Sequence, residues 1–374
     1  MLECFNRYLR MSLIRVVLLG LLLSTQALSP LYASDSAASA DVDVKKIIFE
    51  HVKDAYEWHI TTLGDKHISI YLPVILYTER TGWILFSSKE LHHGGEYNGF
   101  YVASQGVNEG KVVERVDGKE VRPLLDISVT KTVFALFINA LLLLVIVLSI
   151  ARMYKHRRSA GRLNAPGGFV GAFEMLVSMV VDDIAKPNIG AAYARYVPYL
   201  LTAFFFIFLS NIMGIIPFFP GGSNVTGNIA VTMVLAVCTF LAVNLFGNKE
   251  YWKEIFWPDV PVWLKVPVPL MPFIELFGIF VKPFALMIRL FANILAGHTV
   301  VLAFVSIIFV TMAVNSLIGT AMTFVSVVFT VFINFLELLV AFIQAFVFTM
   351  LSSVFIGLSL PQHHTDKHND INEI

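Results

Sequence analysis

Long apolar runs dominate the chain after residue 132, and their lengths predict how it crosses a membrane. Five runs occur, at residues 133–153, 197–219, 226–247, 272–313 and 314–360. About 20 apolar residues cross a bilayer as a helix, so the first three runs have the length of single spans. Each of the last two is either two spans or one long tilted helix, and the absence of an internal polar loop favours the second. The pattern predicts an all-α polytopic membrane protein with about five membrane helices, ending in a long tilted hairpin.

Residues 35–125 have a different pattern, in which short apolar stretches alternate with turn-forming residues. The stretches are Ile68–Tyr77, Gly82–Ser87, Gly99–Ser104, Lys111–Val116 and Lys119–Val121. The dipeptide Asp117-Gly118 between the last two is typical of a β-hairpin. A short amphipathic helix is predicted within Asp41–Thr62. We therefore expect a small, partly β domain here.

The first 34 residues have the features of a signal peptide. Arg7, Arg10 and Arg15 precede an apolar run at Val16–Leu23, and small residues follow as far as Ala33. The alternative is an uncleaved membrane anchor. An exported leader would place the 35–125 domain outside the cytoplasm.

Positive charges in the loops indicate the same orientation. The loop 152–196 carries seven Lys and Arg residues and the loop 248–271 carries three. Because such loops remain on the cytoplasmic side, both loops and the C-terminal tail are predicted to be cytoplasmic. The amphipathic stretch 169–184 is predicted to lie along the membrane surface. The predicted division of the chain is a leader (1–34), an extracytoplasmic domain (35–125), a membrane domain (126–360) and a tail (361–374).

Composition agrees with a membrane protein and excludes other classes. Charged residues are 14% of the 374 residues, apolar residues are 57%, and the 27 basic and 27 acidic residues cancel. Soluble domains contain about 25% charged residues. A disordered chain, a basic nucleic-acid binder and a disulfide-stapled secreted domain are therefore excluded. We expect no metal or cofactor, because neither the two cysteines nor the His92-His93 pair with Glu96 has a metal-ligand spacing.

Four ionisable residues lie inside the final hairpin, where charge is costly and usually functional. They are Glu275, Lys282, Arg289 and Glu337. The first two can reach the cytoplasmic interface by snorkelling. Arg289 lies 17 residues into its run, roughly 25 Å along a helix, and stays charged because an arginine pKa exceeds about 12. It is expected either to pair with Glu337 or to present its charge to a moving ion or a partner protein.

Helical spacing predicts two polar levels in the hairpin. A turn centred near Leu317 places Arg289 opposite position 345, beside Gln344. The same turn places His298 opposite position 336, beside Glu337. His298 lies about half a turn around the helix from Arg289 and ~13 Å farther along it. A His/carboxylate pair can relay protons near neutral pH, whereas an arginine is suited to act as a fixed positive barrier.

Four motifs resemble subunit a of the F-type ATP synthase. Residues 282–298 (KPFALMIRLFANILAGH) are similar to that family's arginine helix, and residues 337–348 (ELLVAFIQAFVF) to its last helix. Residues 211–217 (NIMGIIP) and 224–230 (NVTGNIA) are similar to its second and third spans. The resemblance covers roughly 126–360, and most members of the family lack a domain like 35–125.

The resemblance implies a stator subunit that carries protons through two offset half-channels against a rotating ring of c subunits. Arg289 would match the essential arginine that holds the ring carboxylate ionised and blocks leakage between the half-channels. Asn293 and Gln344 would match its polar neighbours. The outer half-channel would include His298 and Glu337. Many members instead have the acid on the first of these two helices and the histidine on the second. The other matches are Glu275 in the cytoplasmic outlet and Asn211 and Asp126 on the outer side, whereas Gly214 replaces an acid found in some members.

The resemblance also implies partners and a location. The chain would bind the c-ring, b-type peripheral stalk subunits and the rest of the complex, in a bacterial inner membrane. It would not itself be catalytic, because the complex makes the ATP. The His/Glu pair favours protons over sodium as the transported ion.

Two other classes of membrane protein could contain a buried arginine. A secondary transporter would use Arg289 to bind an anionic substrate, but the sequence has no inverted repeat and no broken helices rich in Gly and Pro. An intramembrane protease would need H-E-x-x-H or a spaced pair of membrane aspartates, and neither pattern occurs.

Overall fold

In a computed structural model of the protein, the described residues are 54–63, 66–116, 119–159, 167–216, 219–245, 247–256, 270–314 and 316–360. The predicted leader, the tail 361–374 and the turn Asp117-Gly118 lie outside the described residues. The chain forms two compact units. Unit 1 contains Met1–Leu142, Leu209–Asn228 and Asn293–Val340, and unit 2 contains Leu143–Phe208, Ile229–Ala292 and Ala341–Ile374.

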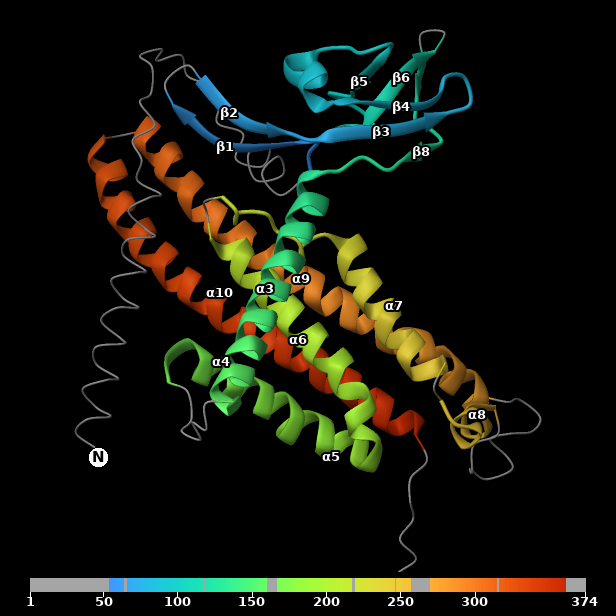
Figure 1. Cartoon of the computed structure of the whole chain (residues 1–374). Helices are drawn as coiled ribbons and strands as arrows, with labels where there is room; N and C mark the ends of the chain where they lie inside the picture. The colour runs from blue at the N-terminus through green and yellow to red at the C-terminus, as the bar shows by residue number, and fades with distance from the viewer. Residues whose placement is uncertain are drawn as a thin grey trace, which may run out of the picture. The chain divides into compact units, whose positions relative to one another are not determined.

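The strands all belong to unit 1 and precede the first membrane helix (Figure 1). They are β1 (Glu57–Leu63), β2 (Lys66–Tyr71), β3 (Pro73–Thr78), β4 (Gly82–Ser87), β5 (Phe100–Val102), β6 (Val112–Val116), β7 (Lys119–Val121) and β8 (Leu125–Asp126). β1 pairs with β2, β3 lies between β4 and β8, and β6 lies between β5 and β7. Every pairing is antiparallel. A short 3₁₀ helix, η1 (Ser88–Gly94), follows β4.

Alternating side chains give the β3–β4 hairpin one buried face. Val74 and Leu76 of β3 have no exposed surface, and they pack in a cluster with Phe86 of β4 and Phe100 of β5. The residues between them point to the other face, as the two-residue period of a strand requires. Burying one face of a sheet in this way supplies the hydrophobic stabilisation of the β region.

The prediction of a short amphipathic helix within Asp41–Thr62 is wrong for residues 57–62, and residues 41–53 lie outside the described residues. Residues 57–62 belong to β1, which pairs with β2 and buries Trp58. Aromatic and β-branched residues such as Trp58, Ile60 and Thr61 fit a pleated surface better than a helix. The apolar stretch Ile68–Tyr77 likewise belongs to two strands, β2 and β3, because the chain changes sheet at the buried Leu72.

The β region is attached to the start of the first membrane helix, α3 (Lys131–Ser159). The backbone N–H of Lys131 donates to the carbonyl of Ala55 at 2.8 Å, and the N–H of Thr132 donates to Asp54 Oδ1 at 3.0 Å. The first N–H groups of a helix have no partner within the helix, so these bonds cap α3. The ring of Trp58 also packs edge-on against Phe134, with 6.0 Å between centroids.

The rest of the described chain is helical. After α3 come α4 (Gly168–Ser178), a π-helical turn η2 (Met179–Ala185), α5 (Lys186–Ile189), η3 (Gly190–Ala192), α6 (Tyr193–Ile215), α7 (Ile229–Leu245), α8 (Lys249–Phe256), α9 (Leu270–Val314) and α10 (Ser316–Ser359). Within the described residues, four helical segments are long and apolar enough to cross a membrane, at Lys131–Ser159, Gly168–Ile215, Phe273–Met312 and Gly319–Ser359. The predicted third span corresponds to α7, whose 17 residues extend about 25 Å, less than the ~30 Å hydrocarbon core. The protein is therefore a mostly helical, multi-pass membrane protein.

The predicted long hairpin is confirmed, since α9 has 45 residues and α10 has 44 (Figure 1). In unit 2, Gln344 of α10 bonds to Arg289 of α9, one residue from the predicted register. In unit 1, Glu337 contacts Gly297, in the predicted register. The hairpin follows from sequence length, because a bilayer tolerates no unpaired backbone and these runs contain no break.

The stretch 169–184 packs one of its sides into the core of unit 2. Val180 and Ile184 have no exposed surface, and the Ser353 hydroxyl of α10 donates to the Ile184 carbonyl at 3.1 Å. At Gly357 of α10 a Cβ would collide with the carbonyl oxygen of Asn188, so only glycine permits this approach. The predicted amphipathic face therefore packs on protein.

Candidate functional site

Arg289 is exposed on α9, in unit 2. Its neighbours Leu286 and Leu290 are buried in the unit 2 core, which fixes the rotation of the helix. Among the described residues, the guanidinium forms no ion pair. Charge on a membrane helix is costly and usually functional, so Arg289 is a candidate functional residue.

Gln344 is buried on α10 and lies at the predicted level. Its side-chain Nε2 donates to the backbone carbonyl of Arg289 at 3.2 Å. The flanking Ala341 and Ala345 are fully buried, and their small side chains let the two helices approach. Gln344 therefore holds the backbone of Arg289, while the guanidinium remains available.

Glu337 is buried on α10, in unit 1. Its carboxylate packs against Gly297 of α9, where a Cβ would lie 3.1 Å from Oε1. The absence of a side chain at Gly297 thus makes room for the carboxylate. His298 follows on α9, but its side chain lies outside the part of the chain that the structure describes. The predicted His298–Glu337 pair stays a prediction.

Asn211 is buried near the end of α6 and belongs to a polar cluster in unit 1. Its Oδ1 accepts a hydrogen bond of 2.6 Å from the Thr226 hydroxyl. The preceding residue, Ser210, accepts one of 3.3 Å from Asn139 of α3. Thr226, Ser210 and Asn139 were not among the predicted site residues. The sequence could have indicated Asn139, because it is the only residue with a side-chain amide in the run 133–153.

Asp126 ends β8 and has partners within the β region. The Tyr56 hydroxyl donates to its Oδ2 at 2.6 Å, and the N–H of Ser128 donates to its Oδ1 at 3.0 Å. Burial, followed by the hydrogen bond to Asp126, raises the pKa of Tyr56. These contacts give Asp126 a structural function, and its predicted place on the proton path remains untested.

Glu275 and Lys282 are partly buried on α9, in unit 2. Burial, followed by the negative charge of Glu275, raises the pKa of the Tyr251 hydroxyl on α8. That hydroxyl donates to Asn244 Oδ1 at 3.3 Å. The Lys282 ammonium lies over the ring of Phe355 at 5.7 Å. Glu275 is thus part of a polar group with Tyr251 and Asn244, which the sequence had not indicated.

Asn293, the remaining predicted residue, is exposed on α9.

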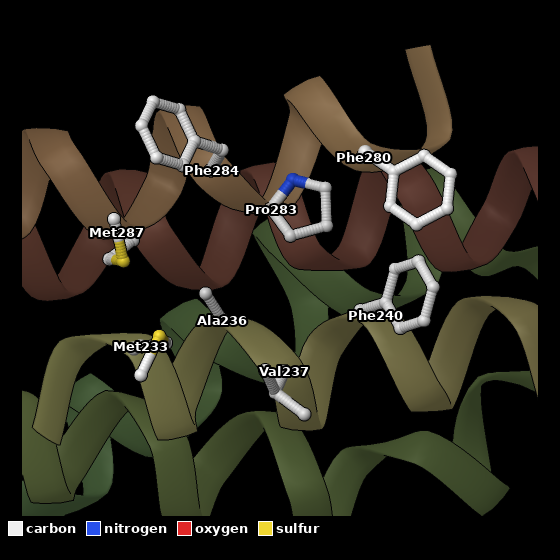
Figure 2. Close-up of a pocket in the computed structure, with 8 residues that line it drawn as sticks. All are labelled: Met233, Ala236, Val237, Phe240, Phe280, Pro283, Phe284 and Met287. Carbon is white, nitrogen blue, oxygen red and sulfur yellow. The ribbon is translucent and has the colours of Figure 1, made fainter. Parts of the chain in front are cut away.

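A pocket in unit 2 lies between α7 and α9 (Figure 2). It is lined by Met233, Ala236, Val237, Phe240, Phe280, Pro283, Phe284 and Met287. All eight side chains are apolar, so the pocket offers no group that could pass a proton.

Comparisons with known proteins identify two parts of the chain. The family described as "ATP synthase A chain" matches residues 133–357, and a "Domain of unknown function (DUF8433)" matches residues 47–128. The first range contains Arg289, Glu337 and Gln344, and the second contains the strands.

Relatives in several bacteria carry the same name. The chain is 45% identical over 243 residues to "ATP synthase subunit a 2" of Prosthecochloris aestuarii, covering 63% of this chain and 69% of the relative. It is 42% identical over 249 residues to "ATP synthase subunit a" of Pelodictyon phaeoclathratiforme, covering 65% and 69%. It is also 42% identical over 252 residues to "ATP synthase subunit a" of Myxococcus xanthus, covering 65% and 77%. Since the family match covers more than half of the chain and includes the exposed arginine of α9, the chain belongs to the family of subunit a of the F-type ATP synthase.

Proposed function

We propose that Arg289 couples proton flow to rotation by facing the carboxylate of a rotating c-ring. The observation that carries this proposal is the exposed position of Arg289 on α9, with its backbone held by the buried Gln344. A cation on this face needs an anionic partner from another molecule. The exposed Asn293 lies one turn farther along α9 and would contact the same partner.

Family membership already defines the general role. The chain is a proton-translocating, membrane-sector subunit of the F-type ATP synthase and is not itself catalytic. Its partners are the other subunits of that complex. We propose that those in direct contact are the c-ring and the b-type peripheral stalk. The secondary transporter and the intramembrane protease are not retained.

The physical reason for an arginine is the cost of charge in lipid. A ring carboxylate that moves through the bilayer must be protonated, because a bare charge there costs several kcal/mol. Facing Arg289, the carboxylate can ionise, since an adjacent cation favours its charged form. The permanent charge of the guanidinium also repels protons and so prevents direct leakage between the two half-channels.

The outer half-channel would include Glu337, His298 and the Asn211 cluster. Glu337 is buried beside Gly297, and Asn211 is buried with Thr226. Buried polar groups of this kind can hold water and pass protons between them. We place Asn139 and Ser210 in the wall of the same half-channel.

The cytoplasmic half-channel would include Glu275, with Tyr251 as its neighbour. This assignment requires the β region to lie outside the cytoplasm and the C-terminus to lie inside, in a bacterial inner membrane. The loop charges support that orientation. A topology assay with a cysteine reagent that does not cross membranes would test it.

The direct test is Arg289→Ala in the complete ATP synthase, reconstituted into vesicles. We expect the complex to assemble and ATP-driven proton pumping to be lost. The matched control is Ile288→Ala, which alters the adjacent exposed position on α9 without removing a charge. Normal pumping by the assembled Arg289→Ala complex would overturn the proposal.

A further inference from the structure

One face of the sheet β4–β3–β8 is apolar and exposed. It consists of Ile75 and Tyr77 from β3, Trp83 and Leu85 from β4, and Leu125 and Ile127 at β8. Trp83 is 62% exposed, Leu85 68% and Ile127 56%. We refer to these six residues as the apolar sheet face.

The strand register makes this face continuous. Tyr77 is the cross-strand partner of both Trp83 and Leu125, and Ile75 is opposite Leu85. The rings of Tyr77 and Trp83 lie 5.1 Å apart. The opposite side of the hairpin already packs in the domain core. Contiguous exposed apolar patches commonly mark a protein or membrane interaction site.

The chain connects this face directly to a membrane-spanning helix. Ile127 lies four positions before Lys131, where α3 begins, a distance of at most ~14 Å in an extended chain. The connecting segment is itself bonded to β3, because the N–H groups of Ile127 and Val129 donate to the carbonyls of Ile75 and Pro73 at 3.0 Å. The sheet is therefore held beside the first residues of α3.

The residue types fit a bilayer interface. Trp and Tyr are enriched there because their rings combine an apolar body with a polar tip. The six residues of the apolar sheet face include no charged side chain. We propose that the apolar sheet face binds the lipid of the adjacent leaflet, with Trp83 and Tyr77 in the headgroup region. This binding holds the β region against the membrane beside α3.

Fluorescence quenching in the complete ATP synthase tests this proposal. Trp83→Cys, in a Cys4→Ser and Cys238→Ser background, would be labelled with bimane and reconstituted into phosphatidylglycerol vesicles containing brominated acyl chains. The control is Val107→Cys, because Val107 is fully exposed in the loop between β5 and β6. We expect quenching by brominated lipid and loss of iodide quenching at position 83, with the opposite result at position 107.

Two outcomes would overturn the proposal. Iodide quenching at position 83 equal to that at 107 would mean that the face is in water. Protection from iodide without quenching by brominated lipid would mean that a protein covers the face. Leu85→Cys provides a second position on β4 if the first label disturbs the sheet. Proton pumping by the same labelled complexes reports separately on the function of Arg289.

Discussion

The two charged sites of the final hairpin differ in how the protein surrounds them. Arg289, in unit 2, is exposed on α9, and only its backbone is held by a neighbouring helix. Glu337, in unit 1, is buried on α10, and its carboxylate fits the space left by Gly297. An exposed charge must be satisfied by another molecule, whereas a buried carboxylate is controlled by its own fold. Under the proposed function, Arg289 would therefore act on a partner, whereas Glu337 would transfer protons within the subunit.

The largest expected effect tests this separation directly. Arg289→Ala should raise the passive proton permeability of vesicles that contain the membrane sector, because the positive barrier is removed. Glu337→Ala should not raise this permeability, because the change removes a polar group from the proton path and does not remove the positive barrier. A pH-sensitive dye in the vesicle lumen would measure both variants. Equal leakage from the two variants would contradict the comparison.

Gly297→Ala should have the next largest effect. The added Cβ would lie 3.1 Å from Oε1 of Glu337, so the carboxylate must move. We expect ATP-driven pumping to fall about tenfold, which corresponds to ~1.4 kcal/mol in the barrier. Gly278→Ala is the matched control on the same helix, because its Cβ would meet nothing within 4 Å. Equal rates for the two variants would mean that the Glu337 position is not critical.

Gln344→Leu should have a smaller effect on the Arg289 site. It removes the hydrogen bond to the Arg289 carbonyl, which contributes about 1 kcal/mol. We expect pumping to fall about fivefold while the complex assembles. Gln344→Asn, whose amide is one methylene shorter, should give an intermediate rate. An unchanged rate for Gln344→Leu would show that the Arg289 backbone needs no support from α10.

The smallest effect is expected at the cluster around Asn211. Asn139→Leu removes the bond to Ser210, and this bond lies one residue from Asn211 rather than on it. We expect a two- to threefold loss of pumping, consistent with less than ~1 kcal/mol. Ser149→Leu, which changes another polar residue of α3, is the control. If Asn139→Leu lost more pumping than Gly297→Ala, the main outer proton path would run through this cluster and not past Glu337.

The elements that the sequence predicted correctly are those defined by long apolar runs. The hairpin α9–α10 was predicted because its runs are long and contain no internal polar loop, which favoured one long helix over two spans in each run, and its register followed from the turn. The level of Gln344 beside Arg289 followed in the same way. Local pattern was less reliable in the β region, where residues 57–62 form a strand through their pairing with β2.

Other features depend on contacts between elements far apart in the chain. Nothing in the local sequence indicates that Gly357 must admit the Asn188 carbonyl, or that Asn139 bonds to Ser210. The cap that Asp54 provides for α3 joins residues 78 positions apart. Such contacts depend on distances of a few ångströms, which periodicity does not specify.

The sequence by itself determined the membrane class, the long hairpin and the family, and it singled out Arg289 as a candidate site residue. These depend on composition, helical period and motif, which are properties of the chain read in order. Only the tertiary structure decided that Arg289 is exposed, that Glu337 is buried against Gly297 and that one sheet face remains uncovered. The physical reason is that exposure is set by which surfaces pack together, and packing joins residues that the sequence keeps apart.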